Sequence, residues 1–206
     1  QTAVNNLSKE GITHGVHLVG DTMLDAVLEF RDIAKTKSSI LNDLGLVPKQ
    51  YLLATLHRPY NTDVPETLYN ILTAFGRVDR RIVFPVHPRT IAKIKEYNIN
   101  LKKLAPNILV CDPVGYLDML MLENNAEMIL TDSGGIQKEA YFFQVPCITL
   151  RPETEWIETV DGGWNILVGT AQDKIVQSVH DQTWFRKVGE DLFGDGQAAK
   201  RIVALF

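Results

Sequence analysis

The stretch from Leu130 to Glu139 reads "LTDSGGIQKE" and places a serine and two glycines directly after an apolar run. Gly134 and Gly135 at a strand-to-helix turn leave backbone N–H groups unobstructed, and the positive end of the following helix favours an anion. Ser133 adds a hydroxyl donor, while Gly135 and Glu139 are four residues apart and share one face of the helix. These residues fit a ligand with phosphates at the helix start and hydroxyl groups about 5 Å further along.

Three interpretations of this stretch stay open from its pattern alone. In the first it binds a nucleoside diphosphate, with the phosphates on the glycine turn and the ribose on Glu139. In the second, Ser133 only caps the helix and the glycines only form a tight turn, which is common before helices. In the third Ser133 is a nucleophile, although its neighbours lack the Gly-x-Ser-x-Gly pattern that supports that role.

Two further clusters place a histidine and an arginine directly behind an apolar run. "TLHRPYN" contains His57 and Arg58, and "FPVHPRT" contains His87 and Arg89. Histidine donates to phosphates or exchanges protons near neutral pH, and arginine offers a planar fork to a phosphate or a carboxylate. The alternative for both clusters is a structural role. Neither histidine has a further Cys or His at ligand spacing, so the sequence predicts no metal site.

The segment "LRPETEWIE" is rich in charge and follows another apolar run. Arg151, Thr154 and Glu155 belong either to a solvated loop or to a sugar-binding loop, with Thr154 or Glu155 as the contact. Trp156 and Trp164 are core residues or a platform for a sugar, and their spacing does not decide between the two.

These clusters need a scaffold that brings them to one place. The apolar runs are continuous rather than alternating, as expected for strands covered on both faces. They lie at residues 17–20, 51–56, 82–86, 108–111, 128–131, 147–150 and 165–169. Helical periodicity predicts helices at residues 22–35, 65–78, 90–97, 116–125, 135–143, 171–182 and 195–206, the first capped by Asp21 or Thr22. This alternation predicts an α/β fold with a doubly wound, mainly parallel, Rossmann-like sheet, whose ligands lie outside the carboxyl ends of the strands.

The composition excludes several classes of protein. A net charge of -4 over 206 residues offers no basic surface to nucleic acid. Cys111 and Cys147 both lie in apolar runs, as expected for buried small residues in a reducing cytoplasm. No run has the roughly 18 apolar residues of a membrane span, so no membrane partner is expected. The first residues resemble no signal peptide and lack an initiator Met, which indicates a piece of a longer protein.

Five motifs together carry a family resemblance: "LHRPYN", "FPVHPRT", "DPVGYLDML", "ILTDSGGIQKEA" and "LRPETEWIE". In order and spacing they resemble the non-hydrolysing UDP-N-acetylglucosamine 2-epimerases, from about Val19 to the end of the chain. The resemblance implies one half of a glycosyltransferase-B-type fold of two Rossmann-like domains. It also implies an enzyme that interconverts UDP-N-acetylglucosamine and UDP-N-acetylmannosamine by eliminating UDP and adding it back. No cofactor is needed in that scheme.

The same resemblance assigns roles to individual residues. It implies that Ser133, Gly134 and Gly135 hold the diphosphate and that Glu139 binds the ribose. His57 matches a histidine that lies near the diphosphate and is implicated in catalysis.

The resemblance implies roles for two further residues, and at two other positions this sequence differs from the usual residue of the family. Arg58 and His87 match residues that bind a second UDP-N-acetylglucosamine as an activator in regulated bacterial members. Met119 occupies the place of an aromatic residue that stacks on uracil in many members, and methionine still covers a flat ring. Tyr60 replaces the acid of the usual His-Arg-x-Glu-Asn motif, so a contact of that carboxylate is missing or altered.

Family members carry a further N-terminal domain with the carboxylates that handle the C2 proton of the sugar. The resemblance therefore predicts that residues 1–18 are the remnant of an interdomain segment, 19–190 the UDP-binding domain and 191–206 a helix that packs on the missing domain. We expect this chain to be inactive by itself. The intact enzyme is expected to be a cytoplasmic homodimer in cell-envelope polysaccharide biosynthesis.

Two other functions stay open. The same fold and nucleotide contacts occur in hydrolysing epimerases and glycosyltransferases. Exchange of deuterium at sugar C2 without release of free sugar would exclude these two functions. A non-catalytic nucleotide-sugar-binding module is the third alternative, with Tyr60 and Met119 as marks of divergence.

Overall fold

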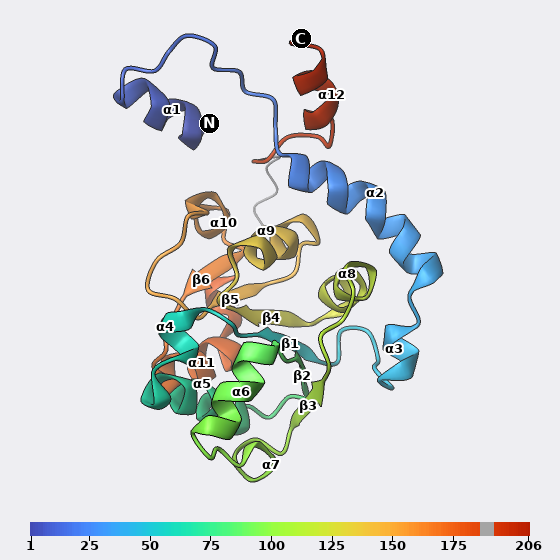
Figure 1. The fold of residues 1–206 in the computed structure, drawn as a ribbon, viewed down its shortest axis with the longest axis vertical. Coiled ribbons are helices and arrows are strands. Elements are labelled where there is room, and N and C mark those ends of the chain that lie inside the picture. The colour runs from blue at the N-terminus through green and yellow to red at the C-terminus, as the bar shows by residue number, and fades with distance from the viewer. Residues whose placement is uncertain (186–191) are drawn as a thin grey trace. The chain divides into compact units, whose positions relative to one another are not determined.

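The computed structural model describes residues 1–185 and 192–206 and divides into two compact units (Figure 1). The larger unit begins at Arg31 and contains the sheet, while the smaller unit joins residues 1–30 to the described C-terminal residues. The domain bounds predicted from the sequence, after residues 18 and 190, stay a prediction.

The larger unit is built on a six-stranded sheet in which every strand pair is parallel. The strands are β1 (Leu52–Thr55), β2 (Ile82–Pro85), β3 (Ile108–Cys111), β4 (Met128–Thr131), β5 (Cys147–Thr149) and β6 (Asn165–Leu167). Their order, β3-β2-β1-β4-β5-β6, is that of dinucleotide-binding doubly wound folds. The four inner strands are buried throughout, which explains their continuous apolar sequence. The predicted Rossmann-like α/β fold is confirmed.

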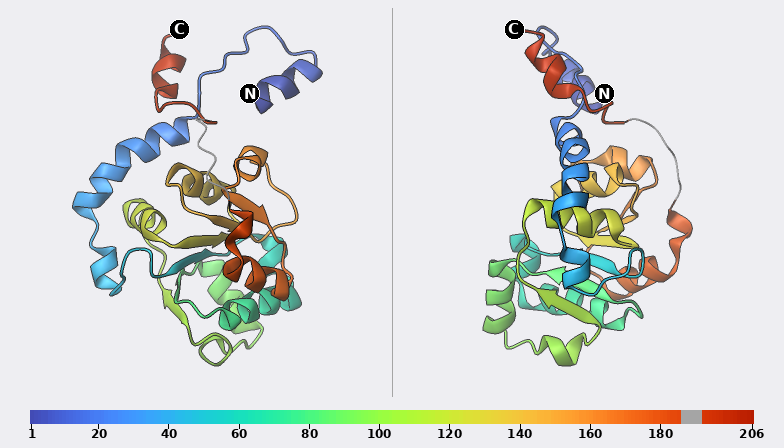
Figure 2. Two further views of the ribbon diagram at one scale, coloured as in Figure 1. Left: turned by 180° about the vertical axis from the view of Figure 1, so that it is seen from behind. Right: turned by 90° about the vertical axis from the view of Figure 1, so that its right-hand side faces the viewer.

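Helices connect the strands, and Figure 2 shows them from two further sides. In the larger unit they are α3 (Ile40–Asp43), α4 (Pro59–Thr62), α5 (Pro65–Arg77), α6 (Pro88–Glu96), α7 (Leu101–Leu104), α8 (Tyr116–Asn125), α9 (Gly134–Phe142), α10 (Ile157–Asp161), α11 (Gln172–His180) and the 3-10 helix η1 (Gln182–Trp184). The longer ones, α5, α6, α8, α9 and α11, confirm the helices predicted in this unit. The remaining ones have five residues or fewer, too few to show a helical period.

Two apolar clusters form the core, one on each face of the sheet. Leu52 and Ala54 of β1 pack on one face with residues of α5, α6 and α11. Leu53, between them, points to the other face and packs with residues of α8 and α9. Figure 1 shows the same arrangement, with the two groups of helices on opposite sides of the strands.

Two helix caps lie in the smaller unit, and one of them joins distant parts of the chain. It contains α1 (Thr2–Lys9), the first part of α2 (Thr22–Lys37) and α12 (Ala198–Val203). The Asp21 carboxylate accepts the Met23 N–H at 2.8 Å, so Asp21 is the predicted cap of α2. The Asp25 carboxylate accepts the N–H groups of Ala198 and Ala199 at 3.0 and 2.7 Å, at the start of α12.

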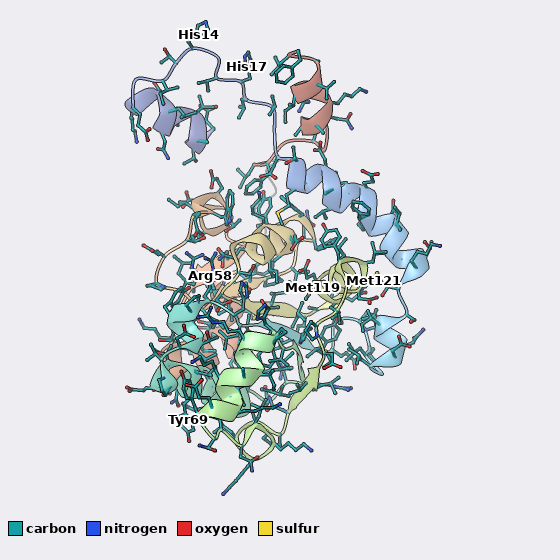
Figure 3. All side chains as sticks on the ribbon, viewed as in Figure 1. His14, His17, Arg58, Tyr69, Met119 and Met121 are labelled. Atoms are coloured by element: carbon teal, nitrogen blue, oxygen red, sulfur yellow. The ribbon has the colours of Figure 1, made fainter. Side chains whose placement is uncertain are left out.

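The strand predicted at residues 17–20 is wrong. The segment is irregular backbone, Leu18 is 65% exposed, and Gly15 and Gly20 adopt φ values of +71° and +99°. A strand needs a neighbouring strand for its hydrogen bonds, and every strand the structure describes begins at or after Leu52. Figure 3 shows His17 at the start of this segment and His14 on the chain before it.

Cys147 is buried, Cys111 is half-buried, and both are free thiols, which fits the expected role as small apolar residues. Among the helices in the described residues, none has the length and apolar character that crossing a bilayer requires.

Candidate functional site

The candidate site lies where the strand order reverses, between β1 and β4. In open α/β sheets this reversal leaves a crevice at the carboxyl ends of the strands, and ligands bind there. His57 follows β1 and Ser133 follows β4, and Thr55 and Thr131 are register partners whose hydroxyl oxygens are 2.6 Å apart. The fold therefore brings two of the predicted clusters to one place.

Asp132 ties these two strand ends together. Its carboxylate accepts the backbone N–H of His57 at 3.1 Å to each oxygen and that of Arg58 at 2.9 Å. The side-chain amide of Asn61 donates to it at 3.1 Å and also to the Leu150 carbonyl, which follows β5, at 3.0 Å. Asp132 is fully buried. One acid thus fixes the loop after β1 against the ends of β4 and β5.

The same carboxylate also orients the imidazole of His57. The Nδ1 atom of His57 lies 3.3 Å from the Asp132 carboxylate, while the ring is 38% exposed. A carboxylate beside one ring nitrogen holds the proton there and leaves the other nitrogen for a ligand. Sequence reasoning missed Asp132, which stands next to the quoted serine but makes its contacts with residues 71 to 75 positions away.

The start of α9 has the features expected of an anion site. Ser133 is the N-cap residue, but its side chain makes no capping hydrogen bond, so the capping interpretation of its hydroxyl is wrong. The first helical bond runs from the Gln137 N–H to the Ser133 carbonyl at 3.2 Å, and the earlier N–H groups have no intrahelical acceptor.

Gly134 lies in close packing at the start of α9. A Cβ atom there would lie 3.2 Å from Nε1 of Trp156 and 3.5 Å from a carboxylate oxygen of Glu155. The loop after β5 therefore covers the start of α9.

Glu139, one turn further along α9, is buried and flanked by α8. Its carboxyl group lies close to Tyr116 and Glu123, both on α8. Burial raises the pKa of Glu139, which the bonds to Glu123 and Tyr116 partly counteract. Burial, with the nearby Glu139 charge next in weight, raises the pKa of Tyr116 to about 12.

The second histidine cluster lies beside the first. The ring centroids of His57 and His87 are 5.9 Å apart, with 40° between the ring planes. His87 caps α6, because its Nδ1 atom accepts the Arg89 N–H at 3.2 Å. Arg89 itself forms an ion pair with Asp63. His87 thus has a structural role as well as a place near the site.

Arg58 is the N-cap of α4 and Tyr60 lies within α4, in the segment that Asp132 holds. The Nε atom of Arg58 is buried and has no hydrogen-bond partner among the residues that the structure describes. Figure 3 shows Arg58 beside α4. Tyr60 is 42% exposed, and partial burial raises its pKa against the opposing effect of Arg151. The activator-binding role implied for Arg58 and His87 stays a prediction.

The charged loop after β5 is organised by internal contacts. Arg151 is buried and forms two hydrogen bonds with the Glu155 carboxylate, at 2.8 and 2.9 Å. The bond from Arg151 lowers the pKa of Glu155 to about 2. The Thr154 hydroxyl donates to Oε1 of Gln137 at 2.6 Å and accepts the Trp156 N–H at 3.0 Å. A sugar contact through Thr154 or Glu155 stays a prediction.

The remaining candidates are apolar. Met119 is half-buried and packs against the core cluster beneath α8 (Figure 3). Trp164 is buried, which identifies it as a core residue. Trp156 lies beside the start of α9, and Nζ of Lys138 is 4.2 Å from the centroid of its ring. Within residues 1–185 and 192–206, no three or more His, Cys, Asp or Glu side chains form a group that could hold a metal ion.

The structure defines an α/β protein with a Rossmann-like fold and a candidate anion site at the switch point of its sheet, and known sequences narrow this class to a family. The sequence profile of the family described as UDP-N-acetylglucosamine 2-epimerase matches residues 1–206. A Methanococcus maripaludis UDP-N-acetylglucosamine 2-epimerase homolog is 47% identical over 98% of this chain and 57% of its own length. A Pseudomonas aeruginosa UDP-2,3-diacetamido-2,3-dideoxy-D-glucuronate 2-epimerase is 40% identical over 98% of this chain and 56% of its own length.

Solved structures agree with these sequence matches. The crystal structure of the Methanocaldococcus jannaschii UDP-GlcNAc 2-epimerase with UDP-GlcNAc and UDP is 42% identical, with a TM-score of 0.88 over 98% of this chain and 57% of that one. The chain belongs to the UDP-N-acetylglucosamine 2-epimerase family. It spans a little over half the length of these relatives.

Proposed function

We propose that this chain supplies the UDP-binding part of a non-hydrolysing UDP-N-acetylglucosamine 2-epimerase. The observation that carries the proposal is the start of α9, at the switch point of the sheet, where the hydroxyl of Ser133 makes no capping bond. Membership of the family and the likeness to an epimerase structure with UDP bound support it.

In the proposed complex the diphosphate lies against the first turn of α9. The N–H groups of Gly134 and Gly135 and the Ser133 hydroxyl donate to its oxygens, and the helix dipole favours its charge. Glu139 follows Gly135 by four residues, a rise of about 6 Å, so its carboxylate accepts the ribose hydroxyls. Met119 covers the uracil ring from α8.

His57 is proposed to act on the diphosphate as a leaving group. Its Nδ1 faces Asp132, so Nε2 is the atom presented to the ligand. In the elimination step the bond between sugar C1 and the diphosphate oxygen breaks as the C2 proton departs, which gives UDP and an acetamidoglucal. His57 stabilises the charge that develops on the departing oxygen. Re-addition of UDP with the proton returned to the opposite face inverts C2.

The groups that move the C2 proton are proposed to lie in a further domain. The chain covers 57% of the Methanococcus maripaludis relative, and the family scheme places those carboxylates in the N-terminal domain. We therefore expect no epimerase activity from these 206 residues alone. The homodimeric state and the cytoplasmic location belong to the same proposal and rest on the family resemblance.

Calorimetric titration of the chain with UDP tests the nucleotide site. We expect binding that Glu139→Ala weakens at least tenfold, since the ribose loses its acceptor and a buried cavity replaces it. Glu66→Gln removes an exposed carboxylate at the start of α5 and is expected to leave the affinity unchanged. Absence of binding at millimolar UDP, or equal affinity of the Glu139 variant and the wild type, would show that the proposed site is wrong.

The reaction itself needs the rest of an epimerase. In a protein that joins this chain to such a domain, we expect deuterium from heavy water to enter sugar C2 without release of free sugar. Release of free sugar would instead support the hydrolysing alternative. Because one relative at 40% identity acts on a 2,3-diacetamido glucuronate, both UDP-sugars are to be compared in this assay.

A further inference from the structure

A fully buried acid lies behind the proposed ribose contact. Glu123 on α8 has 0% of its surface exposed, and neither of its carboxyl oxygens receives a hydrogen bond from an N–H or O–H group of the described residues. The carboxyl group of Glu139 on α9 lies close to it, and its charge adds to the effect of burial on the pKa of Glu123. An acid without a donor in an apolar core requires an explanation.

The explanation is a proton shared between the two carboxyl groups. Two ionised carboxylates are both acceptors and repel each other, so a bond between them needs one of them to be protonated. Burial raises the pKa of Glu123 well above its ordinary value, and the neighbouring Glu139 raises it further. Glu139 is less deeply buried, has a second donor in Tyr116 and is favoured in its charged form by Lys138.

The other titratable groups around Glu123 and Glu139 do not supply a positive charge or a hydrogen-bond donor in place of this proton. Tyr51, directly before β1, and Cys147 on β5 lie close enough to Glu123 that a negative charge on it would raise their pKa values. The Tyr51 hydroxyl donates to the Leu122 carbonyl at 2.7 Å. Burial raises the pKa of the Cys147 thiol to about 12. Lys138 favours the charged form of Glu139, and no cation among the described residues forms a hydrogen bond with the Glu123 carboxyl oxygens.

We propose that Glu123 is a positioning residue that remains protonated at neutral pH and donates a hydrogen bond to the Glu139 carboxylate. Tyr116 at the start of α8 and Glu123 seven residues later then hold Glu139 from two points on one helix. This leaves acceptor capacity on Glu139 for the ribose hydroxyls. The part of the proposal that concerns ribose rests on the proposed UDP site, whereas the proton on Glu123 does not.

Stability as a function of pH tests the proton. The folded protein holds a proton on Glu123 that the unfolded chain releases above about pH 4.5. Wild-type stability is therefore expected to fall as pH rises from that value toward the raised pKa of Glu123. Relative to Glu123→Gln, which has no proton to lose, the unfolding constant should rise by about tenfold per pH unit in this window. A ratio of unfolding constants that stays flat between pH 5 and 8 would overturn the proposal.

Nucleotide binding tests the positioning role. Glu123→Gln keeps a donor for Glu139, whereas Glu123→Met fills similar space without one. We expect Glu123→Gln to bind UDP about tenfold more tightly than Glu123→Met. The 2′,3′-dideoxy analogue of UDP lacks the ribose hydroxyls, so the two variants should bind it with affinities within about threefold.

The outcomes separate this inference from the proposed function. Equal UDP affinities of the two variants, or the same tenfold gap with the dideoxy analogue, would show that Glu123 only fills space. If the wild type binds no UDP, the proposed site is wrong, and the pH dependence of unfolding still decides whether Glu123 carries the proton. Circular dichroism of each variant establishes that it folds.

Discussion

Replacing Asp132 by asparagine should destabilise the site more than any other change of a single charge in it. Asp132 is fully buried, and its carboxylate accepts two backbone N–H groups, from His57 and Arg58, and the side-chain amide of Asn61. Asparagine has the same shape, but one acceptor oxygen becomes an NH2 donor. Whichever way the amide turns, that NH2 group faces other donors.

The size of the effect follows from these contacts. If the amide oxygen of Asp132→Asn occupies the place that receives Arg58 at 2.9 Å and Asn61 at 3.1 Å, those bonds survive with a neutral acceptor. The interaction with the His57 ring at 3.3 Å is then lost. A hydrogen bond to a charged group contributes about 1.5–3 kcal/mol, and a neutral one about 1 kcal/mol. We expect the free energy of unfolding to fall by about 2–4 kcal/mol.

Urea unfolding at pH 7 measures this change, with Asp173→Asn as the matched control. Asp173 is an aspartate with an 88% exposed side chain that pairs with Arg77 at 2.8 Å, so its loss should cost less than about 1 kcal/mol. UDP affinity should also fall in Asp132→Asn, because His57 loses its orientation. If Asp132→Asn is as stable as Asp173→Asn, the three donors do not depend on the carboxylate and the reasoning is refuted.

Two further changes test the loop after β5 and the packing of α5. Glu155→Gln should lower stability at pH 7 by less than about 1 kcal/mol, because the Glu155 side chain is 53% exposed. The hydrogen bond from Arg151 lowers the pKa of Glu155 to about 2. The contribution of Glu155 to the free energy of unfolding is therefore complete above about pH 4.5 and lost as pH falls through about 2. We expect the stabilities of variant and wild type to converge at that acid end. Gly76→Ala would place a Cβ atom 2.2 Å from the Leu104 carbonyl oxygen and should cost about 1–3 kcal/mol in urea unfolding. Gly115→Ala, where nothing lies within 4 Å of the added Cβ, is its control, and equal stability of the two variants would contradict the close approach at Gly76.

The scaffold of the site is predictable because it depends on local patterns. The continuous apolar runs predict strands that are buried on both faces of a sheet, and the amphipathic segments between them predict the helices that cover those faces. Together they predict a parallel sheet with crossover helices. His57 and Ser133 then follow neighbouring strands, although 76 positions separate them in the chain. The wrong strand at residues 17–20 shows the limit of this reasoning, because four apolar-looking residues carry no information about a partner strand.

The supporting acids are harder to predict because their roles depend on distant partners. Asp132 stands inside the most informative motif, yet its donors lie more than 70 residues earlier. Glu123 did have a local signal. It follows the buried Leu120 by three residues, so it falls on the buried face of the helix, where an acid needs a proton or a cation.

The two buried acids show which residues of the site are open to a ligand. Arg151 and Thr154 already have partners in Glu155 and Gln137, so a ligand would have to compete with existing contacts there. Asp132 and Glu123 instead lie behind His57 and Glu139, and each satisfies its neighbour from the protein side. Because Asp132 and Glu123 support them from the protein side, His57 and Glu139 are the two groups through which UDP binding should be most sensitive to substitution.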